Sequence, residues 1–389
     1  MANVLDYLDW RGDLSLTDAP FSDVDALILS RLSYIPFDGI VEPSFQARPV
    51  ALGEAAKKCL ELVRQPDSTR RFRIDTDEDL LTRLTASSRF SNLQLCGYVN
   101  RFNEAQEEQF SAVTILLPEG GVVAFRGTDG TLVGWKEDFN MGFADTVPAQ
   151  LDAVAYLEEA SKAITGPIEV CGHSKGGNLA VYAGAFCAPL VQERIALVRS
   201  NDGPGFMEKT IQKEGFQRII ARTKTFLPQS SVVGMLLEHE EDFSIIHSTN
   251  LGIFQHDVYS WEIVRNGFIT VEGLTNSSHF IDLTLKDWVA NMTKEQREKM
   301  IDGIFSVLNA SDGTTFRELR SGKNALAVLH AWADMDDETK ASIGTAFHLL
   351  ESSMKKAFPA MLEQWHEAKP NNKAYEFLLS FLTSNGQKA

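Results

Sequence analysis

The sequence predicts an α/β protein in which helices flank a mostly parallel central sheet. Strand-like apolar runs alternate with helical patterns between residues 149 and 228, as is typical of parallel sheets. A glycine-rich turn at residues 172–177 joins one of these runs to a helix that is rich in small residues. Only helical patterns follow residue 290. We therefore expect an α/β domain followed by a helical region.

The N-terminal part of this domain, residues 1–85, has a mainly helical pattern. Apolar residues at helical spacing follow a Ser/Asp start in residues 22–35, and the same spacing recurs in residues 52–65. Residues 77–90 predict one further short helix. We include these helices in a single domain that extends over residues 1–290.

From residue 93 onward, the spacing of apolar residues changes from that of helices to that of strands. Runs rich in Val, Tyr and Phe, separated by polar or glycine turns, predict a three-stranded meander over residues 93–103, 109–118 and 121–127. A helix, a buried strand, a second helix and a second strand follow, over residues 149–164, 167–172, 176–188 and 195–200. The remaining strand candidates are residues 223–227, 243–248 and 259–264.

Residues 291–389 are expected to form a helical C-terminal region. Helical patterns occur there with no strand pattern between them, at residues 294–310, 325–335, 338–358 and 373–382. These helices could pack on the α/β domain, join two copies of the chain as a homo-oligomer, or bind a partner. The sequence leaves these three roles open.

The charge and composition of the chain limit its partners. The formal net charge is −16, whereas nucleic acids and anionic membranes require clustered Lys and Arg, so we expect neither as a partner. No basic segment followed by an apolar run begins the sequence, and no window approaches 18 uninterrupted apolar residues, so we expect neither a signal peptide nor a transmembrane segment. The few, widely spaced cysteines predict a reduced cytoplasmic protein without a cysteine metal site.

The turn GHSKGG at residues 172–177 has the pattern of a nucleophile elbow. In such a turn a serine passes sharply from a strand into a helix with a strained backbone, and glycines two positions before and after it leave the necessary room. The helix then directs its N-terminal amides at the site where negative charge develops. The strand pattern before Ser174 and the helix pattern after it favour a catalytic serine over an ordinary glycine turn.

A second motif lies upstream of the elbow. An apolar strand ends there in Phe-Arg-Gly-Thr at residues 125–128 and is followed by Trp135 and Asp138. Together with GHSKGG, this motif resembles the class 3 (fungal-type) lipase family over roughly residues 90–290. The stretches YLDWRGDLS, NDGPGF and QHD also resemble a bacterial branch of α/β-hydrolase-like proteins. The resemblance implies an α/β-hydrolase fold and a serine nucleophile.

Thr128 and Lys175 are the candidate oxyanion-hole residues. The hydroxyl and backbone amide of Thr128, at the tip of a neighbouring strand, can face the elbow together with the amide of Lys175. In class 3 lipases the position of Thr128 has this role, which the resemblance implies here. The alternative for Thr128 is a turn residue that caps the next segment.

Two histidines are candidates for the base that a serine nucleophile requires. His256 follows a predicted strand in a loop that can reach the top of the sheet, and the bacterial branch contains the same Gln-His-Asp stretch. His279 lies just before a predicted helix, and its place along the class 3 pattern favours it. We take His256 as the base and keep His279 as the alternative.

The acid that orients the base is less clear from the sequence. Class 3 lipases place an aspartate at the end of the strand that here covers residues 223–227, but residues 229–231 are Gln-Ser-Ser. Asp202 lies at the end of the preceding strand, from which a carboxylate can also reach a histidine across the top of the sheet. We take Asp202 as the acid, with an Asx-type turn before Gly203-Pro204 as the alternative.

These residues predict a serine hydrolase of the lipase or esterase type. It would cleave an acyl ester or thioester of a small-molecule or lipid substrate, and its mechanism would need neither a metal nor another cofactor. The alternative is a catalytically weak or inactive protein that uses the hydrolase fold as a binding or regulatory module, because fold alone does not determine function. The missing aspartate at residues 229–231 motivates this alternative.

Overall fold

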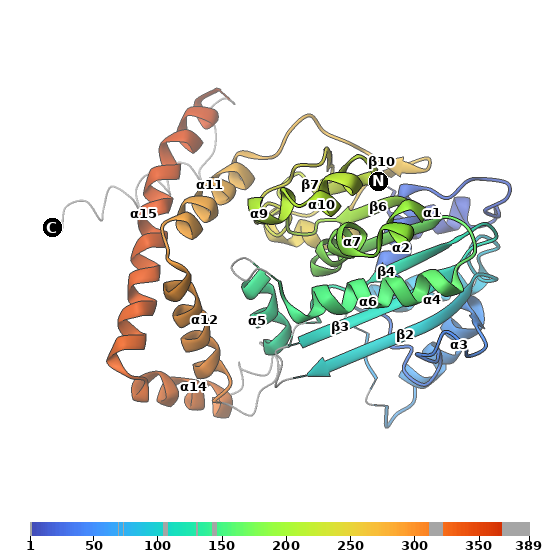
Figure 1. Cartoon of the computed structure of the whole chain (residues 1–389), viewed down its shortest axis with the longest axis horizontal. Coiled ribbons are helices and arrows are strands. Elements are labelled where there is room, and N and C mark those ends of the chain that lie inside the picture. The colour runs from blue at the N-terminus through green and yellow to red at the C-terminus, as the bar shows by residue number, and fades with distance from the viewer. Residues whose placement is uncertain are drawn as a thin grey trace.

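The computed structural model describes residues 2–68, 70–72, 74–103, 108–129, 131–141, 146–310 and 322–367. An eight-stranded sheet lies at its centre, and helices cover both faces of the sheet (Figure 1). The five consecutive strands from β4 to β8 pair in parallel. The chain therefore has the α/β-hydrolase fold that the sequence predicts.

The strands follow chain order across the sheet, from β1 to β8. β1 to β4 pair antiparallel, which confirms the predicted meander of β2, β3 and β4. The predicted parallel strands are present as β5, β6, β7 and β8. The bounds are β1 Val50–Ala51, β2 Gln94–Asn103, β3 Glu108–Leu116, β4 Gly121–Phe125, β5 Ile168–His173, β6 Ile195–Asn201, β7 Thr223–Pro228 and β8 Phe243–Ile246.

Two apolar cores lie on opposite faces of this sheet. Along β4, Val122 and Ala124 join the core of the N-terminal helices, while Val123 and Phe125 join the other core. Side chains alternate between the faces of a strand, so a strand buried on both faces reads as a continuous apolar run. The first core contains α1 Val4–Arg11, α2 Asp23–Leu32, α3 Leu52–Val63 and α4 Thr76–Ala86. The second contains α6 Pro148–Ala163, α7 Lys175–Phe186, α8 Pro189–Arg194, α9 Glu208–Ile211 and α10 Glu214–Ile219.

A buried ion pair ties the N-terminal helices together. Arg89 donates to both carboxylate oxygens of Asp25, at 2.7 and 2.5 Å, and both side chains are fully buried. Asp25 also accepts from the backbone amide of Ser22 and so completes the capping box that begins α2. Arg89 donates further to backbone carbonyls between residues 14 and 20. Its charge is tolerated in the core because it is paired and hydrogen-bonded.

The predicted strand over residues 259–264 is wrong for its first half. Residues Val258–Ser260 form a short 3-10 helix (η3), and only Ile263–Val264 are a strand (β9), paired with β10 Gly267–Phe268. The Asp257 side chain accepts from the amide of Tyr259 and so turns the chain where strand pairing would begin. Other short 3-10 helices are η1 Ile220–Arg222 and η2 Gly252–His256.

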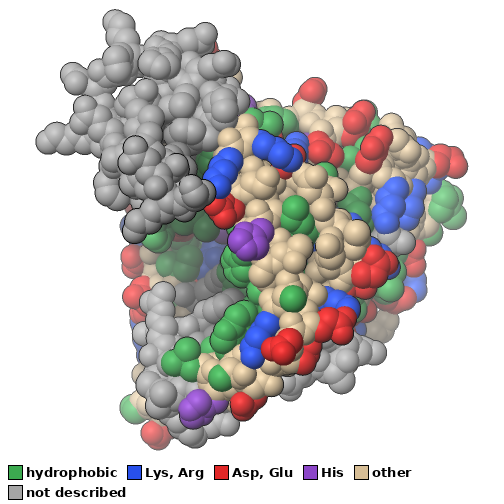
Figure 2. All heavy atoms as spheres, turned by 90° about the vertical axis from the view of Figure 1, so that its left-hand side faces the viewer, with side chains coloured by type: hydrophobic (Ala, Val, Ile, Leu, Met, Phe, Trp, Pro, Cys, Tyr) green, Lys and Arg blue, Asp and Glu red, His purple; other side chains and the backbone are tan. Residues whose placement is uncertain are grey.

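The C-terminal region contains the expected helices. α11 Asn276–Ala290 and α12 Lys294–Leu308 pack against the long helix α15 Asp337–Glu367, and α14 Gly322–Asp334 precedes α15. The helix predicted at residues 373–382 lies outside the described residues. Figure 2 shows apolar side chains among charged ones on the face that includes this region. Association of two copies through these helices and the domain boundary at residue 290 stay predictions.

Helix α5, Leu132–Met141, connects the C-terminal helices to the sheet domain (Figure 1). Leu132 of α5 belongs to an apolar cluster with Ile301 and Phe305 of α12. Lys136 forms an ion pair with Asp302 at 2.8 Å, and Phe139 lies against Phe305. None of the helices within the described residues combines the length and apolar character that a membrane span requires.

Candidate active site

Three of the predicted site residues lie at the carboxyl ends of three neighbouring strands. In the parallel register Phe125 of β4 pairs with Gly172 of β5, and His173 pairs with Asn201 of β6. Thr128 follows β4, Ser174 follows β5 and Asp202 follows β6. Open α/β sheets bind their ligands at this edge. The topology therefore brings together residues that are far apart in the sequence.

Ser174 lies between the last residue of β5 and the first residue of α7. Its φ of 59° and ψ of −135° are outside the regions that a serine ordinarily adopts. Its amide donates to Asn201 O at 2.9 Å, and its carbonyl accepts from Gly177 N at 2.8 Å. The surrounding backbone thus holds Ser174 in a strained conformation of the kind found at nucleophile elbows.

The glycines of the motif allow this turn because the backbone packs too closely for a side chain. A Cβ at Gly172 would overlap the Gly176 carbonyl, and a Cβ at Gly176 would overlap the Phe125 carbonyl. A Cβ at Gly127 would lie 2.8 Å from Ser174 Cβ and would also overlap the Tyr34 hydroxyl. The two sequence motifs therefore touch, with Gly127 directly against Ser174.

His256 is hydrogen-bonded to Asp202. The distance from His256 Nδ1 to Asp202 Oδ2 is 2.6 Å, and the Asp202 side chain is 1% exposed. A carboxylate only accepts, so Nδ1 carries the proton and Nε2 is the nitrogen that can accept another. Asp202 has a φ of 49°, and its amide donates to Phe226 O of β7 at 2.8 Å. This geometry directs the Asp202 carboxylate across the ends of the strands.

The other oxygen of Asp202 is held from the end of β7. Ser231 Oγ donates to Asp202 Oδ1 at 2.5 Å, and Gly234 N donates to the same oxygen at 3.2 Å. Residues 229–231 are where the class 3 pattern would have its aspartate. The hydroxyl that stands there contacts the carboxylate of the neighbouring strand. Sequence reasoning noted the missing acid but did not find this role for Ser231.

A pair of buried polar residues supports the loop that contacts Asp202. His239 Nε2 donates to Gly234 O at 2.6 Å, and His239 Nδ1 donates to Glu241 Oε1 at 2.8 Å. Burial alone would lower the pKa of His239, but the hydrogen bond to Glu241 and its charge outweigh burial, so that pKa lies above its ordinary value. Both ring nitrogens face oxygen acceptors, and the ring fixes the Gly234 carbonyl.

The backbone at His256 is fixed from several sides. Gln255 Oε1 accepts from Ser230 N at 2.7 Å, and the Gln255 carbonyl accepts from Trp261 Nε1 at 2.8 Å. His173 Nε2 donates to the His256 carbonyl at 2.9 Å, and the two imidazole rings lie 4.4 Å apart. The residue before the serine thus holds the residue predicted to be the base.

Tyr34 of the N-terminal part completes this arrangement. Its hydroxyl lies 3.1 Å from His173 Nδ1 and accepts from Gly127 N at 3.1 Å. A carbonyl only accepts, so His173 Nε2 donates, and the single hydroxyl hydrogen of Tyr34 faces both Nδ1 and the carbonyl oxygen of His173, which lies 3.2 Å from the hydroxyl. Sequence reasoning missed both residues. His173 was visible as part of the motif, whereas nothing local marks Tyr34, which lies 139 positions before it.

The predicted oxyanion-hole residues follow two residues that are in close contact, Gly127 and Ser174. Thr128 is 5% exposed and follows Gly127, and its Oγ1 donates to Asp138 Oδ2. Lys175 follows Ser174 and begins α7. Because the hydroxyl of Thr128 is directed to Asp138, its backbone amide is the group left to act as a donor. This role stays a prediction for both residues.

Not all parts of the predicted triad are joined. Within the described residues Ser174 Oγ makes no hydrogen bond, so none joins Ser174 to His256. Such contacts are often loose in the absence of substrate. His279 lies in the first turn of α11, where its amide donates to Thr275 O at 3.1 Å. No hydrogen bond or ion pair of the described residues joins His279 to Ser174 or Asp202.

Residues 84–306 match the family model described as Mbeg1-like, and this range is more than half of the 389-residue chain. The chain belongs to the Mbeg1-like family. Among solved structures, the crystal structure of M37 lipase is similar to 54% of this chain and 67% of its own, with 13% identity and a TM-score of 0.31. A search of curated protein sequences finds no match.

The Mbeg1-like range contains all of the predicted site residues and also α5. Within it, Glu137 of α5 is a buried residue that sequence reasoning missed. Lys175 Nζ donates to Glu137 Oε2 at 2.7 Å and to Gln109 O at 2.8 Å, and the two charged side chains are each 1% exposed. The sequence alone could reveal a buried carboxylate partner for Lys175 only if the lysine side chain were known to point into the core.

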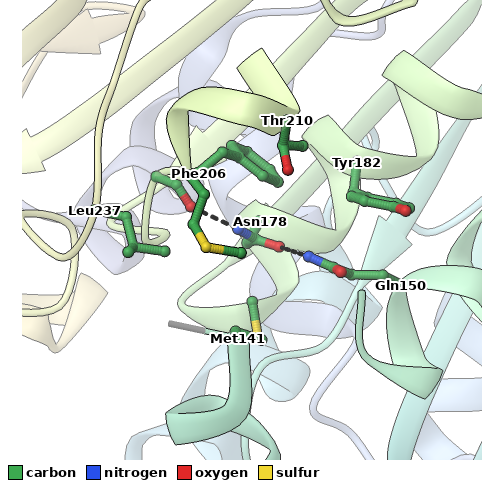
Figure 3. A pocket seen from close by; sticks show the side chains of 9 residues that line it. Met141, Gln150, Asn178, Tyr182, Phe206, Thr210 and Leu237 are labelled. Atoms are coloured by element: carbon green, nitrogen blue, oxygen red, sulfur yellow. Dashed lines mark hydrogen bonds between the residues drawn. The ribbon is translucent and has the colours of Figure 1, made fainter. Parts of the chain in front are cut away.

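A small cavity in the Mbeg1-like range lies behind the second turn of α7 (Figure 3). Its volume is about 10 Å³, which is room for one water molecule and not for an acyl chain. Asn178 lines this cavity. Its Nδ2 donates to the Pro204 and Gly205 carbonyls, and its Oδ1 accepts from Gln150 Nε2 at 2.9 Å. Asn178 therefore holds the chain that follows Asp202 against α7.

Proposed function

We propose that this Mbeg1-like protein is a serine hydrolase that cleaves an acyl ester or thioester. Ser174 is the nucleophile, His256 the base and Asp202 the acid. One observation carries the proposal: a serine with a strained backbone ends one strand, and a buried aspartate hydrogen-bonded to a histidine ends the next. Buried Asp–His pairs beside a strained serine are the arrangement that serine hydrolases use.

In this mechanism Ser174 Oγ attacks the acyl carbonyl carbon while His256 Nε2 accepts the hydroxyl proton. The carbonyl oxygen becomes an oxyanion, which the amides of Lys175 and Thr128 bind. As the tetrahedral intermediate collapses, His256 returns the proton to the departing alkoxide or thiolate, and an acyl-serine remains. Water, deprotonated by His256, then releases the carboxylic acid and restores Ser174. Asp202 keeps the imidazole oriented and stabilises its charged form.

The second candidate is a binding or regulatory module with little or no hydrolase activity. One observation favours it, namely that Ser174 Oγ is not hydrogen-bonded to His256 among the described residues. In that case the Asp202–His256 pair would serve the structure of the loop alone.

Labelling by a fluorophosphonate probe separates these candidates. An activated serine displaces fluoride and forms a phosphonate ester, so the folded wild-type protein is expected to label stoichiometrically on the peptide that contains Ser174. Mass spectrometry of the digested adduct measures both the extent and the position of labelling. Heat-denatured protein is the control. Absence of labelling in protein with a cooperative thermal transition would contradict the hydrolase proposal.

Exposed apolar side chains next to His256 support a lipid acyl substrate. In the 3-10 helix η2 and just before it, Leu251 is 82% exposed, Ile253 57% and Phe254 72%. Three large apolar side chains together on one short loop gain free energy by leaving water. We infer that this loop contacts the acyl chains of an aggregated substrate. We further propose that the protein is cytoplasmic.

Replacement of all three loop residues by serine is expected to lower the rate on a long-chain ester in neutral vesicles by at least about tenfold. The rate on a water-soluble short-chain ester should stay within about twofold, because the triad is untouched. Leu190→Ser is a matched control, since Leu190 is 77% exposed on α8, which leads into the opposite end of β6. Equal losses on both substrates would contradict contact with a lipid surface.

A further inference from the structure

The side chain of Lys175 forms a buried contact that the hydrolase mechanism does not require. Its backbone amide is a predicted oxyanion donor, and its side chain extends away from the solvent to Glu137 Oε2 and Gln109 O. A buried charge pair gives little net stability over well-packed apolar residues, and its better-attested use is to fix one arrangement among several. Its position directly after Ser174 raises the question of which arrangement it fixes.

Both carboxylate oxygens of Glu137 accept hydrogen bonds, and the donors come from three other elements. Oε1 accepts from Ala149 N of α6 at 3.0 Å. Oε2 accepts from Gln109 N of β3 at 3.2 Å and from Lys175 Nζ of α7. The carboxylate thus joins α5 to β3, α6 and the start of α7. A shift of α5 would break several of these hydrogen bonds at once.

The next residue on α5 contacts the other predicted oxyanion donor. Asp138 accepts from Thr128 Oγ1, as Glu137 accepts from Lys175. Neighbouring carboxylates of one helix therefore hold the two residues whose amides would bind the oxyanion. Stabilisation of an oxyanion depends on donors whose positions are set before the reaction begins.

We propose that Glu137 is a positioning residue that sets the separation of the Lys175 and Thr128 amides through the buried Lys175 side chain. This inference rests on the proposed function. Glu137 does not touch the substrate. It acts on the transition state alone, because the carbonyl oxygen reaches its full charge and its final position only there.

Glu137→Gln and Lys175→Met test this role with the full-length protein. Misplacement of a catalytic group by about 1 Å costs on the order of 10² in rate, so kcat on a short-chain ester is expected to fall by about 10- to 100-fold. KM should stay within about twofold. The rate ratio between this ester and its thionoester should fall in parallel, because sulfur is a poor hydrogen-bond acceptor and gains less from an intact oxyanion hole.

The double variant Glu137→Gln/Lys175→Met guards against loss of folding, because it leaves no unpaired buried charge. It is expected to recover the melting temperature but not kcat or the ester-to-thionoester ratio. Asp25→Asn, which breaks the buried Asp25–Arg89 pair of the N-terminal helices, is the matched control and should leave that ratio unchanged.

The outcomes separate the two proposals. If the wild type hydrolyses the ester and the double variant has wild-type kcat and ratio, Glu137 is a structural residue only and the inference is overturned. If the wild type neither hydrolyses the ester nor labels with the fluorophosphonate, the proposed function fails and the inference fails with it. A fall in kcat with an unchanged ratio would also overturn a role in oxyanion geometry.

Discussion

Replacement of Ser174 by alanine is expected to lower kcat on an acyl ester by about 10⁶, because loss of the nucleophile of a triad removes the action of all three residues together. The strained turn should persist, since its hydrogen bonds from Gly177 and to Asn201 involve only the backbone. The melting temperature should therefore change little. Steady-state kinetics and a thermal melt on the same preparation measure both quantities.

A small residual rate would remain consistent with this expectation, because an intact oxyanion hole still accelerates attack by water by about 10³–10⁴. More than about 1% of wild-type kcat in the alanine variant would contradict the assignment. In that case another side chain, or a contaminating hydrolase, would be responsible for the activity.

Replacement of His256 by alanine is expected to lower kcat about as much as loss of the serine, because the serine hydroxyl is a weak nucleophile without its base. His279→Ala is the matched comparison. His279 lies in α11 without a bond to Asp202 among the described residues, so its variant should keep kcat within about twofold.

The reverse result would decide for the alternative base. If His279→Ala is inactive and His256→Ala retains activity, the hydrogen bond between His256 and Asp202 would have a structural role only. Loss of activity in both variants, with folding intact, would also contradict the assignment of a single base to His256.

The fold could be predicted from the sequence wherever a local pattern determines an element. The apolar run of β4 is buried on both faces, and the small residues of α7 allow it to lie close to the sheet, so both had clear signals. Residues 259–262 were predicted wrongly to be part of a strand because Tyr259 and Trp261 resemble strand residues. Their side chains instead bond to Asp77 and to the Gln255 carbonyl, contacts that no local pattern contains.

The candidate site was predictable to the extent that strand ends are predictable. Ser174 has a motif of its own, and Asp202 followed from the rule that parallel strands end at one edge of the sheet. Tyr34, Glu137 and the role of Ser231 were not predictable, because each acts through a contact between segments that only the folded chain brings together. Single polar residues of this kind look like any other in a sequence.

The hydrogen bond between Ser231 and Asp202 has a consequence for substitutions at residue 231. The ends of β6 and β7 supply side chains to the same place, since Ser231 Oγ lies 2.5 Å from Asp202 Oδ1. A carboxyl group at residue 231 would have to share a proton with Asp202, as paired carboxyls do. The hydroxyl of Ser231 instead donates a hydrogen bond and places no second carboxyl group next to the residue that we propose as the acid.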